Sequence, residues 1–182
     1  KTRIGFDKIV TEEWVTFLLE QQIDALTIHG RTTKEMSDVP NHWEEVAKVP
    51  QLRDTISPKT IIIGNGDVKS LEDAHSMINQ YKLDGIMIGR GIFDNPWFFN
   101  PEVDPDQITA KQRLELFDQH IKLFKQTWSD EKYFALLKKF IKMYVVGFPG
   151  CAQERKLLFD AESLNVLHQR VQILLENLPI EA

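Results

Sequence analysis

The chain has 182 residues, of which 42% are hydrophobic, and a formal net charge of −5. A chain of this size buries roughly 70% of its unfolded surface, which is enough for a packed core, and no apolar run approaches the roughly 20 residues of a membrane span. The single cysteine, Cys151, excludes an internal disulfide framework and fits a reducing compartment, so we expect a cytoplasmic protein that does not enter a membrane.

The charge is unevenly distributed along the chain. Residues 1–106 carry 11 Lys and Arg against 18 Asp and Glu, whereas residues 107–182 carry 11 against 9. Proteins that bind nucleic acid are usually more basic, so composition alone disfavours such a partner. A local basic patch would still be sufficient for binding.

Four short apolar runs predict four strands, near residues 1–4, 25–28, 60–63 and 85–88. Helical patterns separate them: a predicted helix from Thr11, a short one over residues 44–49, one that Ser70 caps, and one over residues 92–99. Strands that alternate with helices call for parallel βαβ units. Four such units form half of an eightfold barrel or a small doubly wound sheet, and periodicity does not choose between these two.

The last two strands each end in a pair of glycines, Gly64 with Gly66 and Gly89 with Gly91. Glycine permits positive φ and lets backbone N–H groups approach an anion. In a (β/α)8 barrel, phosphate commonly binds at the loops after the last two strands. The pair of turns therefore indicates a phosphate site, and ordinary glycine turns of an α/β protein are the alternative.

A polar linker follows Pro101, and residues 107–182 have helical patterns throughout. Two apolar stripes predict the core of a helical bundle: Leu114, Phe117, Ile121, Phe124 and Trp128, and Leu164, Leu167, Val171, Leu174 and Leu178. A further helix over Tyr133–Tyr144 is expected to bury Leu136, Leu137, Phe140 and Ile141. Its polar side would then carry a basic patch of Lys138, Lys139 and Lys142.

Four motifs follow one another along the chain: Lys1-Thr2-Arg3-Ile4-Gly5, Thr27-Ile28-His29-Gly30-Arg31-Thr32, Gly64-Asn65-Gly66-Asp67, and Gly89-Arg90-Gly91 with Asn95-Pro96-Trp97 after it. In their order and spacing, these motifs resemble those of the tRNA-dihydrouridine synthases. The resemblance covers nearly all of residues 1–100 and extends more weakly through Gly147 to Arg155.

This resemblance implies an FMN-dependent enzyme that reduces uridine to 5,6-dihydrouridine in tRNA, with NADPH as the reductant. The fold would be α/β plus all-α: residues 1–102 as the second half of a TIM (β/α)8 barrel, and residues 107–182 as a helical tRNA-binding domain. The catalytic cysteine of the family is expected upstream of Lys1, and Cys151 does not match it. We therefore expect a monomeric parent protein and an inactive fragment that either self-associates through its open face or is poorly ordered near Lys1.

The resemblance also assigns site residues. It implies cofactor contacts for Lys1, beside the flavin ring, and for His29, Asn65, Gly66, Asp67, Gly89 and Arg90. The planar guanidinium of Arg90 suits phosphate oxygens, and a cation at Lys1 would stabilise an anionic reduced flavin. tRNA contacts are expected from Arg31, Lys138, Lys139 and Lys142, and no metal site is expected.

Two other functions remain open. A flavin barrel of the dihydroorotate dehydrogenase kind would act on a small molecule, although the basic helical module disfavours it. The chain could also be a stable fragment without activity of its own.

Overall fold

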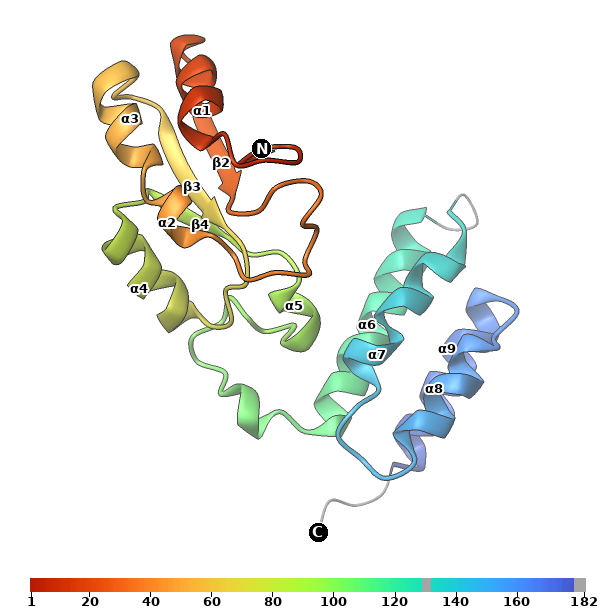
Figure 1. Cartoon of the computed structure of the whole chain (residues 1–182). Coiled ribbons are helices and arrows are strands. Elements are labelled where there is room, and N and C mark those ends of the chain that lie inside the picture. The colour runs from red at the N-terminus through yellow and green to blue at the C-terminus, as the bar shows by residue number, and fades with distance from the viewer. Residues whose placement is uncertain (129–131, 179–182) are drawn as a thin grey trace. The chain divides into compact units, whose positions relative to one another are not determined.

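The computed structural model describes residues 1–128 and 132–178. The chain divides into two compact units, Lys1–Ile92 and Phe93–Ala182 (Figure 1). The first unit is an α/β structure, and the second is helical.

The first unit is built on a parallel sheet of four strands in the order β1-β2-β3-β4. The strands are β1 (Thr2–Arg3), β2 (Ala25–His29), β3 (Ile61–Asn65) and β4 (Gly85–Met87). The connecting helices are α1 (Thr11–Glu20), α2 (Trp43–Val46) with α3 (Val49–Ile56), and α4 (Leu71–Tyr81), and α5 (Gly91–Asp94) follows β4. The predicted alternation of strands and helices is confirmed.

The register of the sheet brings the carboxyl ends of all four strands level. Arg3 pairs with His29, His29 with Asn65, and Asn65 with Met87. Because side chains alternate between the two faces of a strand, these four residues form one row on a single face of the sheet.

The helices cover the opposite face. Buried residues in or beside the strands pack there against buried helix residues. The cluster comprises Ile4, Leu26, Ile28, Ile62 and Leu83 with Val15, Leu19, Val46 and Val49. Burying each such side chain contributes roughly 1.5–3 kcal/mol. On the face that carries His29 and Asn65, by contrast, Ile61 is 49% exposed. The helices of this unit therefore leave the face with the predicted site residues open.

Local sequence signals explain several helix boundaries in this unit. The Ser70 hydroxyl accepts a hydrogen bond from the Asp73 amide at 3.0 Å, which is the predicted cap of α4. The single helix predicted over residues 44–49 is wrong, because Pro50 lies in the first turn of a separate helix, α3. A proline is favourable there, since its missing N–H would have no partner within the helix.

The helix predicted over residues 92–99 is also shorter than expected. It ends at Asp94, and Asn95 precedes Pro96, whose ring disfavours a helical conformation in the residue before it. The Asn95 side chain instead accepts a hydrogen bond from the Trp97 amide at 2.9 Å, so this segment continues as a turn.

The second unit contains η1 (Pro105–Gln107), α6 (Ala110–Trp128), η2 (Phe134–Phe140), α7 (Ile141–Tyr144), α8 (Cys151–Phe159) and α9 (Leu164–Glu176). Its core confirms most of the two predicted stripes: Leu114, Phe117, Ile121 and Phe124 of α6 pack in one cluster with Leu167, Val171 and Leu174 of α9. Trp128 is the exception, because it is the last residue of α6 and is 42% exposed. No helix within the described ranges is both long enough and apolar enough to cross a membrane.

The α-helix predicted over Tyr133–Tyr144 is wrong for most of its length. The segment forms the 3₁₀-helix η2 and then the single turn α7. A 3₁₀-helix has three residues per turn instead of 3.6, so the inward face rotates relative to the predicted one. Leu137 and Ile141 are buried as expected, but Leu136 is 47% exposed.

Candidate functional site

The candidate site lies where the four strands end. Gly5, Gly30, Gly66 and Gly89 stand in the loops that follow the row of Arg3, His29, Asn65 and Met87. In open α/β sheets, ligands bind outside the carboxyl ends of the strands. The register therefore brings the predicted residues His29, Asn65, Gly66 and Asp67 to one edge, with the loop of Gly89 and Arg90 beside them.

A buried ion pair joins two of these loops. The Arg31 side chain is 3% exposed, and its Nη1 donates to Oδ1 of Asp67 at 3.0 Å while Nη2 donates to Oδ2. Its Nε donates to the Val39 carbonyl at 2.7 Å. The hydrogen bonds from Arg31 to Asp67 hold the pKa of the Asp67 carboxyl below its usual value. The Arg31 guanidinium is thus buried and paired within the protein, and the tRNA contact of this residue stays a prediction.

The turn after β3 requires glycine at position 66. Gly66 has a φ of +133°, and a Cβ there would lie 2.1 Å from Oδ1 of Asn41. The next residue, Asp67, has a φ of +52°, which is uncommon for a residue other than glycine. Positive φ is therefore confirmed in the first predicted turn.

The turn after β4 has no such requirement. Gly89 is not among the residues with positive φ, and a Cβ there would meet nothing within 4 Å. The turn at Gly89 therefore does not use the positive φ that glycine permits. What this turn contributes is Arg90, whose side chain is 68% exposed and whose Nη2 lies 3.5 Å from Oδ1 of Asp67.

His29 carries a neutral imidazole at pH 7. Burial, together with the charges of Arg3, Lys1 and Arg31, lowers its pKa from 6.5 to about 4. The structure gives its ring no hydrogen-bond partner within residues 1–128 and 132–178. A neutral imidazole has one donor and one acceptor, so the ring can bind a polar group of a ligand.

Asn65 and Arg3 brace the same edge of the sheet. The side-chain nitrogen of Asn65 donates to the Met87 carbonyl at 2.8 Å, and the backbone carbonyl of Asn65 accepts from the Gly30 amide at 3.4 Å. Nη1 of Arg3 donates to the Thr32 carbonyl at 2.7 Å. The ends of all four strands are therefore tied together at the level of the site.

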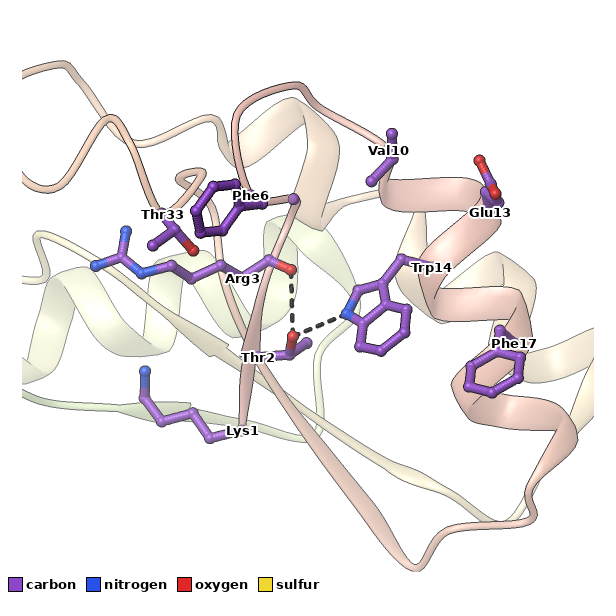
Figure 2. Close-up of a pocket in the computed structure, with 10 residues that line it drawn as sticks. Lys1, Thr2, Arg3, Phe6, Val10, Glu13, Trp14, Phe17 and Thr33 are labelled. Atoms are coloured by element: carbon purple, nitrogen blue, oxygen red, sulfur yellow. Dashed lines mark hydrogen bonds between the residues drawn. The ribbon is translucent and has the colours of Figure 1, made fainter.

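A cavity of about 990 Å³ opens beside the edge strand β1 (Figure 2). Figure 2 shows Lys1 and Arg3 on one side of β1 and the rings of Trp14 and Phe17 on the other, with Trp14 Nε1 donating to Thr2 Oγ1 at 2.8 Å. Its lining includes the predicted residue Lys1 but not the phosphate-turn residues. The cavity therefore lies at the edge of the sheet beside β1 and not at the two turns that are predicted to bind phosphate.

The predicted basic patch of the second unit is not a single free surface. Nζ of Lys138 donates to the Phe159 and Ala161 carbonyls, at 2.6 and 2.7 Å, where α8 ends. Lys139 is exposed with its Nζ 4.8 Å from the centre of the Phe140 ring, and Lys142 is exposed. Lys138 therefore has a capping role, which leaves Lys139 and Lys142 as the accessible cations of the three.

The hydrogen bonds that hold the loop over residues 33–42 were not predicted from the sequence. The Thr32 amide donates to Glu35 at 2.6 Å, and Glu35 also contacts the His42 ring at 3.0 Å, which raises the pKa of His42. A Thr followed three residues later by Glu is the pattern of a capping box and could have revealed this feature. No comparable local pattern predicts the position of Asn41, whose side chain lies next to both Gly30 and Gly66.

Chemically, the first unit is an α/β protein with an excess of cations at the carboxyl edge of a parallel sheet. Arg31 and Arg90 pair with Asp67, and the charges of Lys1 and Arg3 act on the neighbouring His29. This excess of positive charge suits an anionic ligand. In the part of the chain that the structure describes, no group of His, Cys, Asp or Glu side chains could hold a metal ion.

Comparison with known proteins identifies the family. The model of the family described as "Dihydrouridine synthase (Dus)" matches residues 1–178, so the chain belongs to the dihydrouridine synthase family. It is 40% identical over 166 residues to a "Probable tRNA-dihydrouridine synthase" of Staphylococcus aureus (strain N315) and to one of Staphylococcus epidermidis. It is 38% identical over 165 residues to "Probable tRNA-dihydrouridine synthase 2" of Bacillus subtilis (strain 168). Each match covers 90% of this chain but 50% of the relative, so the chain spans about half the length of these relatives.

Proposed function

We propose that this chain is part of a cytoplasmic tRNA-dihydrouridine synthase, which reduces uridine to 5,6-dihydrouridine in tRNA with FMN as cofactor and NADPH as reductant. Residues 1–102 would form the second half of a (β/α)8 barrel, and residues 107–182 a helical domain for tRNA. Family membership supports this function, and the row of Arg3, His29, Asn65 and Met87 at one edge of a parallel sheet carries it.

The residues at this edge fit FMN. A phosphate monoester needs backbone N–H donors and a cation, and the turn at Gly66 and Asp67 with the exposed guanidinium of Arg90 supplies both. The flavin ring would lie toward His29 and Lys1. Burial first and then the positive charges of Arg3, Lys1 and Arg31 lower the pKa of His29 to about 4, and these charges favour an anionic ligand.

When bound, FMN would supply hydride transfer to the uracil ring. The neutral imidazole of His29 would donate or accept one hydrogen bond, and Lys1 would hold a positive charge beside the ring system. Asn65 would keep the strand ends in register through its bond to the Met87 carbonyl. The catalytic cysteine of the family is expected outside this chain, so we expect the isolated chain to be inactive.

A small-molecule oxidoreductase is the second candidate, and one observation favours it. Lys138, which was expected on the tRNA-binding surface, is engaged by the carboxyl end of α8. The accessible basic surface of the second unit is therefore smaller than the sequence indicated. Exposed Lys139 and Lys142 remain the proposed contacts to tRNA phosphates.

The parent protein, with its full barrel, tests this proposal. We expect the purified protein to carry FMN and, with NADPH and unmodified tRNA, to increase the mass of a specific uridine by two hydrogen atoms. A protein that binds FMN but leaves tRNA unchanged, while reducing a free pyrimidine, would favour the second candidate. A protein that binds no FMN would contradict both.

A further inference from the structure

Asp67 lies between two arginines that differ in their surroundings. Arg31 is 3% exposed and bonds both carboxylate oxygens of Asp67, whereas Arg90 is 68% exposed and approaches one oxygen at 3.5 Å. The first contact is a bidentate ion pair, and the second is at the outer limit of a hydrogen bond. The carboxylate therefore has one firm partner and one loose partner.

Arg31 is held on three sides. Its Nε donates to the Val39 carbonyl at 2.7 Å, and its own amide donates to the His29 carbonyl at 2.8 Å. These bonds fix the guanidinium below the turn that follows β3. Each carboxylate oxygen of Asp67 accepts one hydrogen bond from this buried guanidinium.

We propose that Arg31 is a positioning residue that holds the Asp67 carboxylate and keeps Arg90 available for an anionic ligand. This inference rests on the proposed function, in which the anion is the phosphate of FMN. A carboxylate beside a phosphate site repels the anion and competes with it for any nearby arginine. Pairing Asp67 with Arg31 neutralises the repulsion and leaves Arg90 with only a loose contact to Asp67, at 3.5 Å.

Removal of Arg31 should therefore redirect Arg90. In Arg31→Met, the Asp67 carboxylate loses its bidentate partner, and Arg90 is the nearest cation that can replace it. Anion binding should weaken because the ligand loses Arg90 and faces an unpaired carboxylate. In Arg31→Met with Asp67→Asn, the competing charge is absent, so Arg90 should be available again. This rescue distinguishes positioning from a general contribution to folding.

A matched control exists at the other end of the sheet. Arg53 is also largely buried, and its Nη1 donates to Asp84 at 2.9 Å and to the Thr60 carbonyl at 3.0 Å, at the amino end of β3. Arg53→Met removes a comparable ion pair far from the turns at the carboxyl ends. It should lower the unfolding midpoint and leave anion affinity unchanged.

Titration of FMN with the 182-residue chain, followed by flavin fluorescence, measures the effect, and thermal unfolding checks that each variant folds. We expect Arg31→Met to weaken FMN binding by about 10- to 100-fold and the double variant to recover to within about threefold of the wild type. Unchanged affinity in a folded Arg31→Met variant, or no recovery in the double variant, would overturn the inference.

A second measurement does not depend on FMN. Exchange of the Arg90 Nε–H with water, followed by NMR, should slow in Arg31→Met as Arg90 pairs with Asp67, and should return to the wild-type rate in the double variant. If the wild-type chain binds no FMN, the proposed phosphate site fails while this measurement still decides the inference. Slower exchange in Arg31→Met alone supports it, and an unchanged rate contradicts it.

Discussion

His29 on β2 and Asn65 on β3 pair in register as the last residues of their strands. The pairing places a neutral imidazole and an amide side by side on the face of the sheet that the helices leave open. Two motifs that lie far apart in the sequence thereby meet at one edge of the sheet, where the candidate site lies. The following predictions test the roles of the residues around this pair.

The depressed pKa of His29 predicts how stability depends on pH. The folded pKa is about 4 and the unfolded value 6.5, so the unfolded chain takes up a proton that the folded chain excludes. The contribution is complete above pH 6.5 and is lost as the pH falls toward 4. Because the ring is partly exposed, we expect a loss of about 1–2 kcal/mol and not the larger value of a buried group.

Urea unfolding of the wild type and of His29→Gln across this pH range measures the effect. The glutamine variant, which has no titrating group at this position, should show a smaller loss of unfolding free energy between pH 6.5 and 4. A His29 ring that titrates near pH 6.5 by NMR would contradict the prediction.

The two glycine turns should respond differently to a methyl group. Gly66→Ala meets Asn41 Oδ1 at 2.1 Å in a strained backbone region, so we expect a loss of about 2–4 kcal/mol of unfolding free energy. Gly89→Ala meets nothing within 4 Å and should change stability by less than about 0.5 kcal/mol. Chemical denaturation of both variants measures the difference, and equal losses would show that the two turns have the same backbone requirement.

Variants at Lys138 and Lys142 should distinguish an effect on stability from an effect on tRNA binding. Lys138→Met removes two hydrogen bonds to carbonyls at the end of α8, so we expect a loss of about 1–3 kcal/mol in the stability of the second unit. Lys142→Met, at an exposed position, should leave stability unchanged. If Lys142 contacts a phosphate in the parent protein, its removal should reduce the salt dependence of tRNA binding by roughly 0.7–0.9 in log–log slope. A stable Lys138→Met variant would argue against the capping role.

The open edge of the sheet should make the isolated chain self-associate. Strand β1 is paired on one side, and exposed Trp14 and Phe17 line the cavity beside it. Phe17→Glu adds a charge to this apolar surface and should shift the chain toward the monomer. Leu157→Glu, at an exposed apolar position of the second unit, is the control and should have no such effect. Light scattering that finds the wild-type chain monomeric at high concentration would refute this prediction.

Local signals in the sequence were sufficient for much of the fold. The apolar runs, the Ser70 cap and the stripes on α6 and α9 depend on neighbouring residues. The first two predictions are confirmed, and so are the stripes except at Trp128. The segment around Leu136 was misjudged because helical spacing does not distinguish an α-helix from a 3₁₀-helix over one or two turns.

The roles of charged residues were harder to predict because their partners are distant in the sequence. Arg31 pairs with Asp67, 36 residues away, and Lys138 bonds carbonyls 21 and 23 residues away. When the partner of a basic residue in a loop or on a helix is not known, the sequence alone suggests that the residue contacts solvent or a ligand. The motifs around His29 and Asn65 therefore predicted residues that the structure brings together, whereas the burial of Arg31 depended on tertiary structure.

The most direct test of the proposed site is FMN binding by the 182-residue chain with and without Arg90. Arg90→Ala removes an exposed cation that is proposed to contact phosphate, and Lys59→Ala removes an exposed cation just before β3, at the opposite end of the strands. By flavin fluorescence, we predict that Arg90→Ala weakens binding by about tenfold or more, whereas Lys59→Ala leaves it unchanged. Equal affinities for the wild type and Arg90→Ala would contradict the assignment of this edge as the phosphate site.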